Sequence, residues 1–299
     1  MRIGIIGGTG IGERLVAELG GDAPQPQAVD TPFGPPSADL LLTTLRPDGG
    51  QAVDVALLSR HGDGHAVPPH MLPARANIYA MKALGVTHIV ATGAVGSLRE
   101  EIRPGEVVVC DQLIDRTAGR ARTFFDDLAV HVEFAEPFCP VMRQWLLDAS
   151  PAAGVKVHPT GACVVIDGPS FSTRAESLMH RQWGADLVGM TVLPEARLAR
   201  EAEIAYAMLA LPTDDDAWRP RAVDAPSESL LTEIIGNLQR ASDAALRVLQ
   251  SALADVAALR AHTSPAHDAL RHAVWTSSIS VETASRLGML LERHVSNER

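Results

Sequence analysis

Three consecutive carboxylates, Asp214, Asp215 and Asp216, follow an apolar run at residues 205–211. Like charges at this spacing repel one another and resist burial, so they need solvent, a cation, or a ligand that presents donors or protons. On an extended strand end, neighbouring side chains point to opposite sides, so Asp214 and Asp216 can converge while Asp215 faces away. A solvated turn is the alternative to a ligand site.

A glycine-rich turn, GGTGIG at residues 7–12, directly follows the first predicted strand. Such a turn lets backbone N–H groups approach an anion, and Thr9 adds a hydroxyl donor. The spacing matches neither the G-x-G-x-x-G dinucleotide fingerprint nor the GxxxxGK[ST] phosphate loop. Phosphate binding and a simple strand-to-loop turn both remain open.

Two further turns could complete an anion pocket. In the segment LLSRHGDGH at 57–65, an apolar strand ends in Arg60, His61 and His65 around two glycines. The guanidinium fork of an arginine matches phosphate oxygens, and a neighbouring histidine can add a donor. The segment ATGAVGSLREE at 91–101 is another strand that runs into a turn of small residues. Ligands of open α/β sheets collect beyond the carboxyl ends of the strands, so three such turns can share one site.

An aromatic residue, Phe171 in GPSFSTRAES, could stack on a flat ring. An ordinary place in the core is equally compatible with a phenylalanine. Met190 and Thr191 end another predicted strand. Metal binding explains none of these sites well, because no pair of histidines has helical i, i+4 spacing beside a glutamate.

The composition excludes several classes of function. The chain has 299 residues, 46% of them apolar, which can bury one large α/β domain or two smaller ones. Its net charge of −10 argues against a general nucleic-acid surface. No stretch reaches the length of a membrane span and the N-terminus reads as a strand, so we expect a cytoplasmic protein. The three scattered cysteines, Cys110, Cys139 and Cys163, are expected to be reduced core thiols.

The elements that must position these residues alternate between short β-rich runs and amphipathic segments, which indicates a sheet covered by helices. Helices are predicted at 73–85, at 173–184 with a capping box from Thr173 to Glu176, and as one long helix from 227 to about 261. Two short helical stretches should follow that helix. The predicted strands are 2–7, 39–45, 53–59, 87–93, 106–114, 162–167, 186–191 and 205–211.

Taken in order, these motifs resemble the S-methyl-5'-thioadenosine phosphorylases of the trimeric purine nucleoside phosphorylase family. The resemblance runs through IGIIGGTG, SRHGDGH, GAVGSLREEIRPGEVVVCDQLIDRT, FAEPFCP, IDGPSFSTRAES, MTVLPEARLAREAEIAYA and TDDDAW, or about residues 2–220. It implies a single α/β domain at 1–260 with a central mixed, twisted β-sheet flanked by helices. Residues 261–299 would form a helical C-terminal extension of unknown role.

The resemblance also implies roles for matching positions. Phosphate is the co-substrate, no metal or organic cofactor is needed, and the partners are a purine nucleoside and further copies of the chain in a homotrimer. His131 would reach the 5' end of the nucleoside held by a neighbouring subunit. The implied phosphate ligands are Thr9, Arg60, His61, the Ala94 backbone and Thr191, and the implied nucleoside contacts are Met190 at the ribose and Phe171, Ser172, Asp214 and Asp216 at the purine.

Asp214 is the expected proton donor. Relatives that act on 6-oxopurines resemble this pattern with Asn at that position, so Asp favours a 6-aminopurine, and two close carboxylates can share the proton passed to the base through a raised apparent pKa. Bound phosphate would attack C1' as the glycosidic bond breaks.

Three departures from the family leave the substrate open. Gly93 stands where a Thr is usual, Ser170 where an Arg is usual, and the segment 71–77 lacks a usual Asn-Tyr pair. Adenosine or a nucleoside of specialised metabolism would also fit. A hydrolytic nucleosidase and a non-catalytic nucleoside-binding protein are the alternatives from other functional classes.

Overall fold

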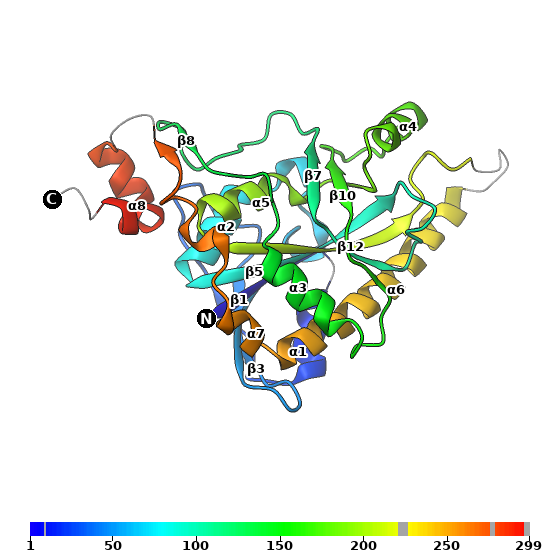
Figure 1. Ribbon diagram of the computed structural model, residues 1–299, viewed down its shortest axis with the longest axis horizontal. Helices are drawn as coiled ribbons and strands as arrows, with labels where there is room; N and C mark the ends of the chain where they lie inside the picture. The colour runs from blue at the N-terminus through cyan, green and yellow to red at the C-terminus, as the bar shows by residue number, and fades with distance from the viewer. Residues whose placement is uncertain (9, 221–226, 276–278, 296–299) are drawn as a thin grey trace.

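A central β-sheet organises the computed structural model, which describes residues 1–8, 10–220, 227–275 and 279–295 (Figure 1). In the described chain this sheet has eleven strands. They are β1 (Arg2–Gly7), β2 (Gln25–Gln27), β3 (Leu40–Leu45), β4 (Val53–Ser59), β5 (Val86–Ser97), β6 (Val107–Val109), β7 (Gln112–Asp115), β9 (Val157–His158), β10 (Ala162–Val165), β11 (Leu187–Gly189) and β12 (Ala205–Asp214).

The sheet is mixed, and its central strand β5 pairs with β1, β11 and β12. The strand order runs β2-β3-β4-β1-β5-β11-β10-β7, with β12 pairing with β5 and β6, and β9 with β6. Strands β1, β4, β5 and β12 are mutually parallel, so their carboxyl ends lie at one edge. Strand β11 pairs with the carboxyl end of β5 in the antiparallel direction. This arrangement confirms the mixed α/β fold expected from the resemblance.

Helices cover both faces of the sheet. One buried apolar cluster packs α2 (Ala74–Ala83), α5 (Val192–Glu201) and α8 (Val281–Val295) against the strands, and the other packs α1 (Ile11–Leu19), α3 (Pro140–Ala149) and α6 (Ser227–Ala254). The remaining helical elements are α4 (Arg174–Gln182), α7 (Ala257–Ala261), η1 (Asp63–His65), η2 (Pro69–Met71) and η3 (Pro265–Asp268). The predicted capping box of α4 is present, with Thr173 and Glu176 each bonded to the other's backbone.

Two predicted elements are wrong in their extent. The strand predicted at 106–114 is broken, because β6 pairs with β12 and β9 whereas β7 pairs with β10, so the chain changes neighbours between the two. The long helix predicted from 227 to 261 ends at Ala254. There the Asp255 N–H bonds the Ala252 carbonyl in a tighter turn, and the helical path resumes only as α7.

The C-terminal segment packs against the rest of the fold. Where two short helices were expected, the described part of this segment contains the short η3 and one longer helix, α8, whose Thr283 and Arg286 hydrogen-bond Asp127. Arg293 pairs with the buried Glu203 at 3.4 Å. Strand β13 (Val274–Trp275) pairs with β8 (Val130–His131) in a separate two-stranded sheet. The division at residue 260 stays a prediction.

All three cysteines are free and buried, as predicted. Within the described ranges, no helix is long and apolar enough to cross a bilayer. In that same part of the chain, no group of three or more His, Cys, Asp or Glu side chains is arranged to hold a metal ion.

Candidate active site

A cavity of about 520 Å³ lies at the carboxyl ends of β1, β4, β5 and β12. The loop at 168–172, the end of β11 and the helix α6 line its remaining walls. All the described residues that the sequence assigned to the site line it except His131: Arg60, His61, Ala94, Phe171, Ser172, Met190, Thr191, Asp214 and Asp216. Thr9 lies outside the described residues.

Arg60 is held in a fixed orientation at one end of this cavity. The residue is only 1% exposed, and its Nε and Nη2 donate to the two carboxylate oxygens of Glu195 at 2.9 and 3.0 Å. Its Nη1 donates to the Thr92 carbonyl at 2.7 Å. A guanidinium has five N–H donors, so one proton on each terminal nitrogen is left for a ligand.

Glu195 sets the electrostatics of this end. Burial alone would lower the pKa of the Arg60 guanidinium, but the charge and hydrogen bonds of Glu195 outweigh burial and raise it. Tyr206 donates its hydroxyl to the same carboxylate at 2.5 Å. Arg60 is therefore a permanent, pre-oriented cation, which suits an anion with several oxygens.

His61 lines the cavity and keeps one ring nitrogen available as an acceptor. Its Nδ1 lies 2.8 Å from the Val67 carbonyl, which can only accept, so Nδ1 carries the proton. Burial, with smaller contributions from His65 and Arg60, lowers the pKa of His61 even though the Val67 hydrogen bond opposes this. The neutral ring thus leaves Nε2 able to accept a proton from a protonated phosphate oxygen.

Small residues bring two strand ends close together beside Arg60. A methyl group placed on Gly93 would lie 3.5 Å from Thr191 Oγ1 and 3.3 Å from Met208 Cε. Thr191 precedes α5, and its hydroxyl makes no capping hydrogen bond to that helix. Thr191 Oγ1 and the backbone of Ala94 are therefore well placed to donate to the same ligand as Arg60.

The two predicted carboxylates lie together at the other end of the cavity. Asp214 Oδ1 accepts from the Asp216 backbone N–H at 2.8 Å, and its Oδ2 lies 2.8 Å from Thr213 Oγ1. Gly96 makes the close approach possible, since a methyl group there would meet Asp216 Cβ at 3.1 Å and Asp214 Oδ1 at 3.3 Å. Asp215 lines no part of the cavity and pairs with Arg219 at 3.0 Å. Asp214 and Asp216 therefore converge as predicted, but through a turn and not through strand alternation, because β12 ends at Asp214 and Asp216 has a φ of +46°.

Phe171 and Ser172 line the same end of the cavity, and neither side chain is fixed by packing or by a hydrogen bond within the described residues. Phe171 is 67% exposed, so it is not a core residue in this chain. The buried hydroxyl of Ser172 and Asp216 Oδ2 have no hydrogen-bond partner among the described residues. Buried polar atoms are normally satisfied, so this end lacks groups that a bound ring with polar edges would supply.

His131 lies apart from the cavity. It is exposed on β8, where it pairs with Val274 of β13. The structure therefore does not bring His131 into the site of its own chain, and a contact to a neighbouring subunit stays a prediction.

Sequence reasoning missed Glu195, Tyr206 and Thr213, which hold the site residues in place. One signal was available for Glu195: a buried arginine at a strand end requires a carboxylate partner, and Glu195 follows Thr191 closely in MTVLPE. Nothing in the sequence pairs Tyr206, eleven residues further along, with that carboxylate.

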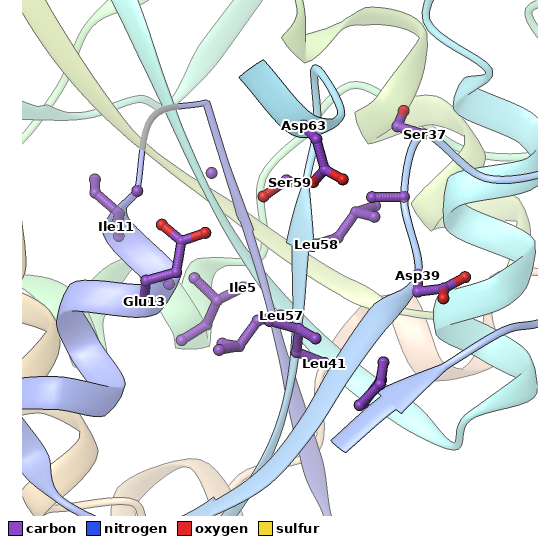
Figure 2. Close-up of a pocket in the computed structure, with 15 residues that line it drawn as sticks. Ile5, Ile11, Glu13, Ser37, Asp39, Leu41, Leu57, Leu58, Ser59 and Asp63 are labelled. Carbon is purple, nitrogen blue, oxygen red and sulfur yellow. The ribbon is translucent and has the colours of Figure 1, made fainter. Parts of the chain in front are cut away.

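A second hollow of about 390 Å³ is lined by residues of the glycine-rich turn and of β4 (Figure 2). The carboxylates of Glu13, Asp39 and Asp63 line it, and no described lysine, arginine or histidine does. This electrostatic character repels anions, so the larger cavity beside Arg60 is the candidate active site.

Known proteins resemble this chain over nearly its full length. Residues 2–254 match the family described as the Phosphorylase superfamily. An S-methyl-5'-thioadenosine phosphorylase of Chloroflexus aurantiacus is 45% identical over 276 residues, 92% of this chain and 91% of the relative. The one from Geobacter sulfurreducens is 41% identical and covers 98% of this chain and 99% of its own.

Solved structures agree with the sequence relatives. A methylthioadenosine phosphorylase from an antarctic soil metagenomic library superimposes with a TM-score of 0.86 at 42% identity, covering 97% of this chain and 98% of its own. A variant of the adenosine/methylthioadenosine phosphorylase of Schistosoma mansoni, in complex with methylthioadenosine, gives 0.75 at 36% identity, with coverages of 88% and 93%. The chain therefore belongs to the phosphorylase superfamily.

Proposed function

We propose that this chain catalyses phosphorolysis of S-methyl-5'-thioadenosine, giving adenine and 5-methylthioribose 1-phosphate. One observation carries the proposal: a single cavity joins a buried, pre-oriented guanidinium at one end to a pair of adjacent carboxylates at the other. Phosphorolysis of a 6-aminopurine nucleoside needs an anion site and a proton donor on opposite sides of a sugar. The names of the full-length relatives support the same reaction.

At the anion end, phosphate would bind Arg60, His61, Thr191 and the Ala94 backbone N–H, and Thr9 would add a hydroxyl from the glycine-rich turn. Arg60 contributes its two remaining N–H groups, and its charge does not depend on pH in the physiological range. A dianion in this position also stabilises positive charge on the ribosyl ring as the glycosidic bond stretches.

At the base end, a chain of hydrogen bonds is compatible with a protonated Asp214. Thr213 Oγ1 lies 2.8 Å from Asp214 Oδ2 and 3.3 Å from the Val95 carbonyl, yet a hydroxyl has one proton. If Asp214 carries a proton on Oδ2, it donates to Thr213, which donates in turn to Val95. Both contacts are then satisfied. Thr213 would therefore keep a proton on Asp214 until the base accepts it.

The reaction balances with these groups alone. The electron pair of the N9–C1' bond moves into the purine, N7 accepts the Asp214 proton, and neutral adenine leaves. A phosphate oxygen forms the new bond to C1' from the opposite face. Asp216 would accept a hydrogen bond from the 6-amino group, and Phe171 would stack on the purine ring.

Apolar side chains favour an apolar 5' substituent. Ile11, Leu211, Ile234 and Leu238 line the cavity beside the polar groups, and Met190 would lie against the ribose. A thioether methyl group can be buried among these residues, whereas a 5'-hydroxyl there would need a partner. This lining favours methylthioadenosine over adenosine.

The assembly and location are part of the proposal. A homotrimer in the cytoplasm, with His131 of one subunit at the 5' end of the nucleoside of the next, would give the exposed β8 a function. The reaction needs no metal or organic cofactor, since positioning and electrostatics supply the rate. Gel filtration with light scattering tests the trimer directly.

A product assay tests the reaction. Adenine release is measured from methylthioadenosine, adenosine and methylthioinosine, each with and without phosphate. We expect release from methylthioadenosine to be fastest and to need phosphate. Release that does not depend on phosphate would mean hydrolysis, and tight binding without turnover would mean a nucleoside-binding protein.

A further inference from the structure

Thr92 carries a buried hydroxyl that nothing in the proposed mechanism uses. The residue is 1% exposed and lines the candidate active site. Its Oγ1 has no hydrogen-bond partner among the described residues. Burying a hydroxyl without a partner costs free energy, so an unpaired hydroxyl on a residue that lines a cavity is a candidate to bond a ligand there.

This hydroxyl lies among the groups of the anion end. The Thr92 carbonyl accepts from Arg60 Nη1 at 2.7 Å, which holds the guanidinium against this residue. On the neighbouring strand β1, a methyl group placed on Gly7 would lie 3.6 Å from Thr92 Oγ1. The Gly7 carbonyl in turn accepts from the Arg60 backbone N–H at 2.9 Å. Thr92 Oγ1 thus lies beside the start of the glycine-rich turn, on the residue whose carbonyl binds Arg60.

The surroundings of Thr92 leave few other partners. On its face of the sheet the cavity is lined by the apolar side chains of Ile11, Leu211 and Leu238. The next residue along β5 is Gly93, which has no side chain to offer. Among the described side chains of β5 that line the cavity, Thr92 provides the hydroxyl.

We propose that Thr92 Oγ–H donates a hydrogen bond to the bound phosphate and so acts as a further phosphate-binding residue. The assignment rests on the proposed phosphorolysis. A neutral hydroxyl beside Arg60 adds a directional donor without adding charge, and phosphate has more acceptor sites than the two remaining Arg60 protons can fill.

Two matched pairs of variants test the proposal. Thr92→Val differs from the wild type, and Thr92→Ala from Thr92→Ser, mainly by the hydroxyl. The Michaelis constant for phosphate is measured at saturating methylthioadenosine, and that for methylthioadenosine at saturating phosphate. We expect loss of the hydroxyl in either pair to raise the phosphate constant about tenfold. The nucleoside constant should change less than about twofold.

A threonine remote from the cavity provides the control. Thr43 on β3 is also buried, and its hydroxyl donates to the Asp22 carbonyl at 2.6 Å. Thr43→Val should reduce the melting temperature without changing the phosphate constant. A Thr92 hydroxyl with a purely structural role would give the same result.

The outcomes separate the two proposals. Equal phosphate constants within both Thr92 pairs would overturn the role of Thr92 while leaving phosphorolysis intact. If the wild type releases adenine without phosphate, phosphorolysis fails. The Thr92 assignment is then judged by the rise in melting temperature that added phosphate causes, which must be smaller in Thr92→Ala than in Thr92→Ser. The Ser and Ala variants also decide the matter if Thr92→Val does not fold.

Discussion

The two ends of the cavity hold their polar groups in different ways. At the anion end, Arg60 is 1% exposed and makes three hydrogen bonds to Glu195 and to the Thr92 carbonyl. At the base end, Phe171 is 67% exposed, and the side-chain atoms Asp216 Oδ2 and Ser172 Oγ have no partner within the described chain.

The difference follows from the cost of burying charge. A guanidinium cannot lose its proton, so a buried one needs a carboxylate partner before any ligand arrives. A hydroxyl or a phenyl ring without a partner costs less free energy before the ligand binds than an unpaired buried charge does. We therefore expect changes at the anion end to lower both stability and activity, and changes at the base end to lower activity alone.

The largest expected effect on activity is at the base end. Asp214→Asn removes the proton donor but keeps an oxygen that can accept the Asp216 N–H. We expect kcat for methylthioadenosine to fall by about 10²–10⁴-fold, the usual contribution of general acid catalysis, with an unchanged melting temperature. Asp215→Asn is the matched control, because Asp215 pairs with Arg219 outside the cavity. Equal losses in both variants would contradict the assignment.

The largest expected effect on stability is at the anion end. Glu195→Gln leaves Arg60 buried with one neutral partner, which should cost about 3–5 kcal/mol in the free energy of unfolding and also weaken phosphate binding. Urea denaturation and phosphate kinetics measure the two effects.

Glu201, on the same helix α5, gives a matched control for that substitution. It is 5% exposed, and burial raises its pKa to about 7 although the Phe124 N–H opposes this. Glu201→Gln therefore replaces an acid that is only about half ionised at pH 7 with a neutral amide. It should leave phosphate kinetics unchanged and cost clearly less stability than Glu195→Gln. If Glu195→Gln proves as mild, the two ends of the cavity do not differ in the way we describe.

A smaller effect is expected from Phe171. Because its ring is mostly exposed, Phe171→Leu should not reduce the melting temperature. Loss of stacking on the purine should raise the Michaelis constant for the nucleoside about tenfold, from roughly 1–2 kcal/mol. Phe171→Tyr keeps the ring and should bind normally. A large loss of stability in Phe171→Leu would show that this end is packed like a core after all.

The same contrast explains how far the sequence could predict the site. Residues at strand ends were found because parallel strands bring their carboxyl ends to one edge. Asp214 and Asp216 were expected together from strand alternation, but β12 ends at Asp214 and a turn brings Asp216 back to it. The groups that hold Arg60 were not found. The Glu195–Arg60 contact joins residues 135 positions apart, and no local pattern encodes it.

Fold elements were predictable where local signals are strong. The capping box of α4 begins the helix where the sequence indicates, and β1 and β4 have the predicted bounds. Helices α1, α3 and α5 were not predicted: none of them has the side-chain capping hydrogen bond that marks α4, and tertiary packing stabilises such short helices more than local signals do. The break between α6 and α7 was missed because the apolar repeat continues through Val256 and Leu259, both buried in the same cluster.

The smallest expected effect concerns the pH dependence of the anion end. Burial lowers the folded-state pKa of His61 below its ordinary 6.5, so the unfolded chain binds this proton first as the pH falls. The contribution of His61 is thus fully present above pH 6.5 and is lost below it. His61→Gln cannot titrate and should show a shallower loss of stability on acidification, measured by urea denaturation at pH 7.5, 6.5 and 5.5. Identical slopes in the two proteins would mean that His61 is solvated in the folded state, and that the anion end is less closed than its hydrogen bonds imply.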